Sequence, residues 1–201
     1  MKKVICGLAV LAALSSAQAF AHKEGNFIVR AGLASVVPND DSDETLGAKL
    51  EVDSNTQLGL TFGYMFTDNI SFEVLAASPF THDISIQGVG KAGETKHLPP
   101  TLMVEYYFGN SESDFRPYVG AGINYTFFFD EKLDSAASLS LDDSWGLAAN
   151  VGLDYMINDD WFVNGSIWYA DIDTTATIGG ATNVDIEIDP WVFMISGGYK
   201  F

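Results

Sequence analysis

Eight runs of alternating apolar and small or polar residues constrain the fold of this 201-residue chain more than any other feature. An alternation of period two is typical of a β-strand whose two faces meet different surroundings. No apolar-phase position in any run carries a charge. Soluble sheets also alternate, but their strands are rarely this long and their outward phase is polar. The apolar phases span residues 27–33, 58–66, 70–76, 102–108, 119–129, 145–157, 161–169 and 191–201.

Aromatic side chains gather toward the ends of these apolar phases. Such a distribution is expected of a transmembrane β-barrel, which carries aromatic girdles at both membrane–water interfaces. A charge on the lipid-facing phase at mid-bilayer would cost about 2–4 kcal/mol, which explains why none occurs there. The pattern therefore predicts an all-β fold, an eight-stranded antiparallel transmembrane β-barrel. The aromatic positions are Tyr64, Phe66, Tyr106, Phe108, Trp145, Trp161, Trp191, Tyr199 and Phe201.

The connections between the runs alternate in length. Outer-membrane barrels have short periplasmic turns and long external loops, so both chain ends are expected on the periplasmic side. The long loops are expected to be acidic, and prolines 79, 99, 100 and 190 mark where strands meet them. The short connections are 67–69, 109–114 and 158–160, and the long ones are roughly 37–55, 81–98, 130–143 and 174–186.

The first 21 residues have the form of a secretory signal peptide. Lys2 and Lys3 precede an apolar stretch over 4–14, and Ala19-Phe20-Ala21 is a small-x-small cleavage site. We therefore expect 1–21 to be cleaved and 22–201 to form the barrel, with cleavage after Ala19 as the alternative. The lone cysteine, Cys6, lies in the signal, so the mature chain is expected to have no disulfide.

The charge of the chain is strongly negative. It has 10 Lys and Arg against 27 Asp and Glu, a net charge of −17, and loss of Lys2 and Lys3 makes the net charge −19. Such a surface repels nucleic acid and anionic bilayers. A hydrophobic fraction of 47% argues against the disorder that acidic chains often show.

The other phase of each run is expected to face the lumen, and it contains six charged residues in the periplasmic half or near the middle. Charges in a low-dielectric interior need partners, so we predict an ion network, favoured as a structural floor over a proton or ion path. Seven lumen glycines, among them Gly152 and Gly198, either leave space or relieve barrel curvature. The charged residues are Arg30, Glu73, Glu105, Arg116, Asp154 and Lys200.

Apolar residues share this lumen phase. A polar porin would place hydrophilic side chains there, so an apolar chamber above a charged floor favours a small hydrophobic solute. Because the floor would block a straight exit, a solute is expected to leave sideways through the barrel wall. The apolar lumen residues are Leu75, Trp168, Met103, Phe128, Met194, Ile172 and Met65.

The chain resembles the outer membrane protein W (OmpW) family of Gram-negative bacteria. The resemblance implies an eight-stranded barrel with a narrow apolar channel, in which Leu75 of "LAASPF" and Trp168 narrow the passage; simple core packing is the alternative. It also implies external loops that bacteriocins or phage can use as receptors. The matching stretches are "NTQLGLTFGYMFTDNI", "LAASPF", "HLPPTLM", "FRPYVGAGINYT", "DSWG", "DIDTTA" and "DPWVFMISGGYKF".

Catalytic and metal-binding signals are weak. His82-Asp83 with Ser78 or Ser85 is the best triad-like set, but its spacing is unspecific. His82 and His97 flank the second long loop and could approach each other, yet loop histidines are usually solvated and no metal-ligand spacing is present. We predict no catalytic residue, no metal and no cofactor, so a surface lipid enzyme is the least favoured reading.

The sequence thus predicts a narrow channel or carrier for small hydrophobic molecules in the cell outer membrane. The alternative is a structural or receptor barrel with a plugged lumen. Expected partners are membrane lipid, lipopolysaccharide, a small hydrophobic ligand and the outer-membrane assembly machinery, with no nucleic acid. Tyr199 and Phe201 resemble the C-terminal aromatic signal that this machinery reads.

Overall fold

The computed structural model describes residues 21–39, 41–42, 50–86, 90–135 and 137–201. The predicted signal peptide therefore lies outside the described residues, apart from Ala21. No helix in the described ranges is long and apolar enough to cross a membrane. The strands are β1 (Phe27–Val37), β2 (Asp41–Ser42), β3 (Leu50–Val52), β4 (Asn55–Met65), β5 (Ile70–Ala77), β6 (Phe80–Ile86), β7 (Gly90–Leu98), β8 (Thr101–Tyr107), β9 (Phe115–Leu133), β10 (Leu139–Leu141), β11 (Ser144–Met156), β12 (Trp161–Ala170), β13 (Asp173–Ile178), β14 (Thr182–Glu187) and β15 (Trp191–Lys200).

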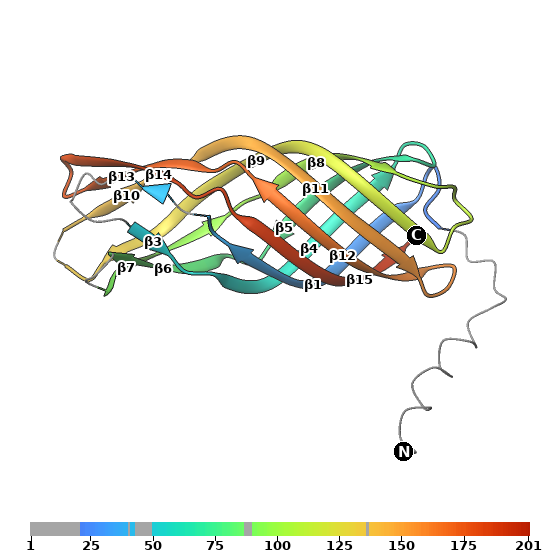
Figure 1. Cartoon of the computed structure of the whole chain (residues 1–201), viewed down its shortest axis with the longest axis horizontal. Coiled ribbons are helices and arrows are strands. Elements are labelled where there is room, and N and C mark those ends of the chain that lie inside the picture. The colour runs from blue at the N-terminus through green and yellow to red at the C-terminus, as the bar shows by residue number, and fades with distance from the viewer. Residues whose placement is uncertain (1–20, 40, 43–49, 87–89, 136) are drawn as a thin grey trace, which may run out of the picture.

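Eight of these strands form a closed antiparallel barrel, which confirms the predicted fold. Their order is β11-β12-β15-β1-β4-β5-β8-β9, and pairing of β9 with β11 closes the ring. Figure 1 shows the tilted strands running along an elongated molecule, with the start of β1 and the end of β15 at the same end. Closure is required because lipid offers no partner for an unpaired backbone edge.

The alternation of the sequence appears directly as alternating exposure. Leu33, Leu147 and Ile195 are 64%, 70% and 78% exposed, although each is a large aliphatic residue. Along β12 nearly every second residue is buried and the residues between face outward. The apolar phase therefore forms the outer, lipid-facing surface, as predicted, and the other phase lines the lumen.

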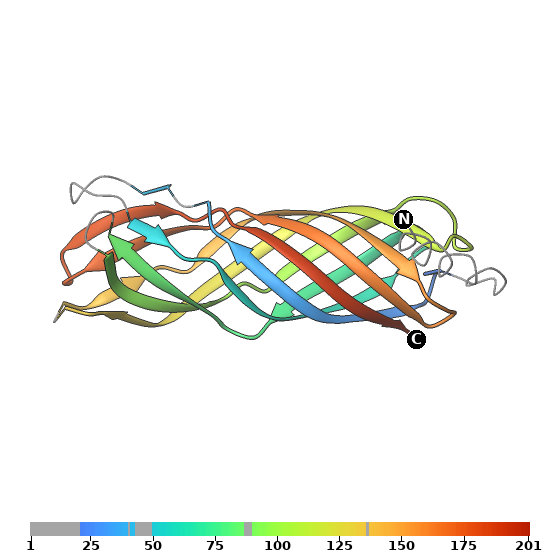
Figure 2. The ribbon, with the colours of Figure 1, turned by 60° about the horizontal axis from the view of Figure 1, so that its bottom comes forward.

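The long connections lie at one end of the barrel, as predicted, but most of their described residues form paired strands instead of irregular loops. The β6–β7 hairpin pairs with β3 and with the outer half of β9, and β10, β13, β14 and β2 form a second sheet. Both extensions lie at the external end (Figures 1 and 2). Pairing supplies partners for backbone groups that a long loop would leave unmatched. Residues 40, 43–49, 87–89 and 136 of these connections lie outside the described residues.

Charged pairs on the outer surface mark where the external extension leaves the lipid. Lys91 Nζ lies 2.8 Å from Asp83 Oδ1, and Lys96 Nζ lies 2.9 Å from Asp130 Oδ2. All four side chains are substantially exposed, which lipid would not tolerate. The β6–β7 hairpin therefore projects beyond the membrane-spanning part of the barrel.

Prolines interrupt the wall between the third and fourth barrel strands. The ladder between β5 and β8 ends at Leu75 opposite Thr101, and the next paired residues are Phe80 and His97 of β6 and β7. Pro79 lies in one gap and prolines 99 and 100 in the other. Because proline donates no backbone hydrogen bond, the ladder is broken here, where the sequence predicted strands to meet connections.

Two lumen glycines let aromatic rings cross the barrel. A Cβ on Gly152 would lie 2.3 Å from the Tyr118 ring, and a Cβ on Gly198 would lie 2.0 Å from the Phe162 ring. The space left by these missing side chains is therefore filled near the periplasmic end. At these two positions close packing, rather than an open lumen, accounts for glycine.

Candidate functional site

The buried lumen side chains form three clusters, stacked from the periplasmic to the external end. We call them the floor, the constriction and the chamber. The hydrophobic members of the floor include Ile28, Met65, Tyr107, Tyr118, Met156 and Phe162. The constriction contains Ala34, Val36, Leu75, Phe80, Met103, Ala148, Trp168 and Met194. The chamber contains Ile84, Phe128, Leu141, Ala170, Ile172, Ala176, Val184 and Ile186.

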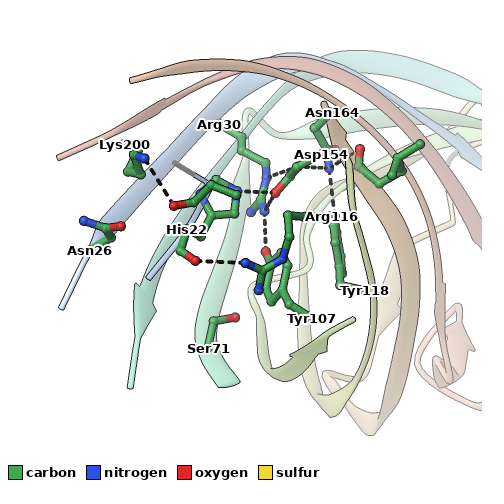
Figure 3. Close-up of polar contacts among 12 residues, drawn as sticks. His22, Asn26, Arg30, Ser71, Tyr107, Arg116, Tyr118, Asp154, Asn164 and Lys200 are labelled. Carbon is green, nitrogen blue, oxygen red and sulfur yellow. Dashed lines mark hydrogen bonds and ion pairs between the residues drawn. The ribbon is translucent and has the colours of Figure 1, made fainter. Parts of the chain in front are cut away.

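Arg30 of β1 is the centre of the floor (Figure 3). Its guanidinium donates to Glu73 through Nη1, to Asp154 Oδ2 through Nη2 at 2.7 Å, and to the Tyr107 hydroxyl at 2.6 Å. Its carbon Cζ also lies 5.4 Å from the centre of the Tyr118 ring. Arg30 is buried, and it neutralises two buried carboxylates that come from different strands.

Asp154 of β11 ties the floor to the N-terminal segment. His22 Nε2 donates to Asp154 Oδ2 at 2.7 Å, and Asn164 Nδ2 donates to Oδ1 at 2.7 Å. The His22 ring packs edge-on against Phe162, with centroids 4.7 Å apart. Residues before β1 therefore enter the barrel and help to close its periplasmic end, which the sequence analysis did not anticipate.

The remaining predicted ion-network residues are held in other ways. Glu105 accepts hydrogen bonds from Asn150 Nδ2 at 2.7 Å and from Ser71. Arg116 donates to the backbone carbonyls of His22, Asn110 and Asp68 instead of to a carboxylate. Lys200 Nζ donates to the carbonyl of Ala21 at 3.3 Å. The network thus has one ion-paired centre, surrounded by polar side chains that hold the backbone.

The constriction brings four of the predicted apolar residues together. Leu75, Met103, Trp168 and Met194 come from four strands and are all buried. Trp168 Nε1 donates to Ser166 Oγ at 3.0 Å, which holds the indole across the lumen. The other predicted residues lie elsewhere in the lumen: Phe128 and Ile172 are in the chamber and Met65 is in the floor.

The chamber contains a narrow cavity with a nearly apolar lining. Its volume is about 30 Å³, room for one or two water molecules. The only nitrogen-bearing side chains among its lining residues belong to His82 and His97. The residues that line the cavity are Val36, Pro38, Val52, His82, Ile84, Thr95, His97, Phe128, Leu141, Thr174, Ile186 and Ile188.

His82 and His97 stack inside the barrel, so the expectation of solvated loop histidines is wrong. They lie on neighbouring strands β6 and β7, with ring centroids 4.9 Å apart and planes 10° apart. The alternation "FTHDISI" over 80–86 could have revealed this, since Phe80, His82 and Ile84 share one face. Burial followed by repulsion from His82 lowers the pKa of His97 to about 3, and burial lowers the pKa of His82.

The triad-like set is divided between the two faces of the sheet. His82 is buried in the lumen, whereas Asp83 next to it points outward and accepts from Lys91. Ser78 is exposed and donates to Gln57. Adjacent residues of a strand point to opposite faces, so this set cannot assemble a nucleophile and a base.

Three carboxylates gather at the external end of the outer surface. Oxygens of Asp171, Asp173 and Asp189 lie within 4.8 Å of one another. Asp189 already accepts from the backbone N–H of Ile172 and from the Tyr169 hydroxyl. This group is part of the predicted acidic external surface, and its hydrogen bonds join β12 to the segment before β15.

Comparison with known proteins identifies close relatives of this chain. A model described as the OmpW family matches residues 23–201. Outer membrane protein W of Vibrio cholerae serotype O1 is 66% identical over 217 aligned residues, covering 100% of both chains. The crystal structure of the outer membrane protein OprG from Pseudomonas aeruginosa matches with a TM-score of 0.84 and 46% identity, over 92% of this chain and 99% of that chain. The dibenzothiophene metabolism operon protein PahQ of Pseudomonas aeruginosa is 26% identical over 162 residues, 77% of this chain and 76% of PahQ.

Proposed function

This chain belongs to the OmpW family of outer-membrane proteins, and we propose that it is a narrow channel or carrier for small hydrophobic molecules. The observation that carries this proposal is the lining of the lumen above the floor. Beside buried polar side chains such as Thr101, Asn124 and Ser166, the constriction and the chamber hold two clusters of buried aliphatic, aromatic and thioether side chains, in a barrel whose outer surface already faces lipid. A lumen built for sugars or ions would present polar groups instead.

The exit for such a solute lies in the barrel wall. Arg30, Glu73 and Asp154 close the straight path with buried ion pairs, and opening it would separate them. Just above, the ladder between β5–β6 and β7–β8 is broken at the prolines. A solute that reaches Leu75 and Trp168 from the external end is therefore released sideways into the lipid through this break.

The relatives support an apolar solute. PahQ is named for the metabolism of dibenzothiophene, an aromatic molecule with little polar surface. The surface of the cavity in the chamber of this chain is also nearly apolar, although two histidines and two threonines are among its lining residues. The proposal takes from this comparison the sequence similarity to PahQ, and it adds the apolar cavity of this chain.

Replacement of Leu75 and Trp168 together by alanine tests the proposed constriction. Both side chains are buried in the lumen, and their loss widens the passage. We expect a change in the uptake of a hydrophobic fluorescent probe by proteoliposomes, and a rise in single-channel conductance. The control is Leu33→Ala with Trp145→Ala, which removes the same side chains from the lipid-facing surface.

If neither uptake nor conductance differs between the lumen variant and the control, the two residues are simple core packing. If the unaltered barrel takes up no hydrophobic probe at all, the alternative stands: a structural or receptor barrel with a plugged lumen. Binding of a bacteriocin or phage to the external extension would then be the activity to measure. Lipid A of a deletion strain should be unchanged under either reading.

The predicted processing and assembly signals are part of this proposal. N-terminal sequencing of the outer-membrane form should begin at His22, and a start at Phe20 would support the alternative cleavage site. Tyr199 and Phe201 lie on the outer surface with ring centroids 4.7 Å apart. We propose that the assembly machinery reads these two residues, and that the acidic external surface meets lipopolysaccharide.

A further inference from the structure

The stacked histidines lie between the constriction and the chamber. The His97 ring stacks on Phe80 of the constriction, with centroids 5.5 Å apart, and contacts Phe128 of the chamber at 5.9 Å. His82 and His97 are only 1% and 6% exposed. A solute moving from the external end to the constriction therefore passes these two imidazoles.

The hydrogen bond of His82 fixes which of its nitrogens carries the proton. His82 Nδ1 lies 2.5 Å from the backbone carbonyl oxygen of Asp53. A carbonyl oxygen only accepts, so Nδ1 must donate and Nε2 of the neutral ring carries a lone pair. That nitrogen is buried, and among the described residues it has no hydrogen-bond partner.

His97 offers a second nitrogen to the same cavity. Its Nε2 is also buried and also lacks a partner within the described part of the chain. Burial and repulsion between the rings hold the pKa of His97 at about 3, so the pair is neutral at physiological pH. Among the described residues, the charged groups that act on His82 include Asp83 on the outer face and Asp53 in the turn before β4, and neither is hydrogen-bonded to the two free nitrogens.

Buried nitrogens without a partner are costly unless a ligand or water meets them. Around them, the cavity is lined by aliphatic and aromatic side chains, including Ile84, Phe128 and Ile186. The cavity is too narrow for a bulky ring in the observed conformation, at about 30 Å³. Its volume and its two free nitrogens suit one small head group, and a chain attached to that group must extend out of the cavity along the apolar lining.

We propose that His82 and His97 form a head-group site that selects straight-chain molecules ending in a hydroxyl group. The hydroxyl donates to His82 Nε2, and its oxygen lies beside the His97 ring, while the chain follows the apolar lining toward Leu75 and Trp168. The inference rests on the proposed carriage of hydrophobic molecules and adds a preference within that class.

The tautomer of His82 makes the preference specific. A primary alcohol has the donor that the lone pair needs. Its methyl ether has almost the same chain and oxygen but no donor, and a carboxylate at neutral pH only accepts. The site should therefore bind an alcohol more tightly than the matched ether. It should bind the carboxylate most weakly, because the carboxylate must also be desolvated.

Binding of octan-1-ol and 1-methoxyoctane to the unaltered barrel in lipid nanodiscs is the first test. The readout is the ¹⁵N resonance of the histidine Nε2 atoms, followed against ligand concentration in the lipid. We expect octan-1-ol to shift the His82 resonance and to bind about threefold to tenfold more tightly, the worth of one hydrogen bond. This comparison needs no substitution, so it stands even if variants fold poorly.

His82→Phe is the second test, because it keeps an aromatic ring in the stack and removes the acceptor. Octan-1-ol should then bind no better than 1-methoxyoctane, while the affinity for the ether stays the same. The matched control is Thr95→Val, which alters another buried residue of the cavity lining and leaves both histidines in place. It should leave the preference for the alcohol unchanged.

The outcomes separate this inference from the proposed function. If alcohol and ether both enter and bind equally, the head-group site is refuted and the hydrophobic channel stands. If neither binds nor is taken up, the channel itself fails. If Zn²⁺ alone shifts both Nε2 resonances at low concentration and octan-1-ol shifts neither, the pair is a metal site and the proposal is overturned. If water is the only partner of the two nitrogens, neither octan-1-ol nor 1-methoxyoctane nor Zn²⁺ will shift the Nε2 resonances, and the head-group site is refuted.

Discussion

The floor and the chamber lie in one barrel and both bury nitrogen-bearing side chains, but they treat them differently. In the floor, Arg30 and Asp154 are joined by direct hydrogen bonds, and aromatic rings from Tyr118 and Phe162 fill the space around them. In the chamber, His82 and His97 line a cavity, and their Nε2 atoms meet no partner among the described residues.

The contrast shows how a narrow barrel can close its periplasmic end in one region and leave another region able to bind a ligand. Among the described residues some floor atoms also lack a partner, such as Glu73 Oε1 and Arg116 Nε, but neither of these side chains lines the cavity of the chamber. The floor is therefore a structural unit whose hydrogen bonds and ion pairs stabilise the barrel. The chamber keeps its free polar atoms beside open space, where a ligand can meet them.

Arg30→Met should produce the largest effect, because it removes the cation between two buried carboxylates. Breaking a buried ion pair by deleting one partner typically costs about 3–5 kcal/mol. We expect the free energy of unfolding to fall by that amount in urea titrations of vesicle-reconstituted barrel, followed by tryptophan fluorescence. Ion conductance should rise, since the floor loses its centre.

Arg116→Met is the matched control for the floor. Arg116 is equally long and buried, but it donates to backbone carbonyls and leaves no carboxylate uncompensated. Its loss should cost about 1–3 kcal/mol, the penalty for unmatched acceptors. Equal losses in the two variants would mean that the ion pairs are not the centre of the floor.

Gly152→Ala should have a smaller effect, of about 1–3 kcal/mol, typical of overpacking. The new methyl would lie 2.3 Å from the Tyr118 ring, whose hydroxyl also accepts a hydrogen bond from Asn164 Nδ2. Gly165→Ala is the control, since nothing lies within 4 Å of its Cβ position on the outer face. Both variants are compared by the same urea titration, and an unchanged Gly152→Ala barrel would show that the ring can move aside.

Much of this architecture is predictable from the sequence because lipid imposes a simple rule. The outer face must be apolar and free of charge, so period two alone identified eight strands and assigned residues such as Leu75 and Asp154 to the lumen. Charge on the lumen phase also identified Arg30 and Glu73 as members of a buried network of acids and bases, although not as a pair. These features depend only on the residue type and on whether a residue has an odd or an even position in its strand, and both can be read from the sequence.

The rest depends on where strands end and how side chains reach across the lumen. Histidines 82 and 97 lie in segments that length alone marked as a loop, although they pair as a hairpin against β9. His22 reaches Asp154 from outside any strand, so no alternation could place it. Likewise, the alternation along the strand predicts that Arg116 faces inward, but it does not predict that Arg116 donates to carbonyl oxygens.

The boundary between floor and chamber should be the point of release, and disulfide staples across the wall can test this. The described barrel contains no cysteine, so introduced pairs are unambiguous. Val74 faces Leu102 below the proline break, and Thr81 faces Lys96 above it. Directly opposed residues of antiparallel strands lie about 4.5–5.5 Å apart at Cα, within disulfide range. Cysteines at both pairs should slow the uptake of a hydrophobic probe several-fold, reversibly on reduction.

The control staples join β12 to β15, where the ladder is continuous. Val163 faces Gly197 and Ile167 faces Phe193, all on the outer surface. Because this part of the wall is already held by an unbroken ladder, cross-linking it should leave uptake unchanged. Equal slowing by both sets would point to general stiffening of the barrel. If neither set of staples slows uptake, the exit does not lie at the proline break. The floor is then the next candidate, and ion conductance and probe uptake should be measured together in the Arg30→Met barrel.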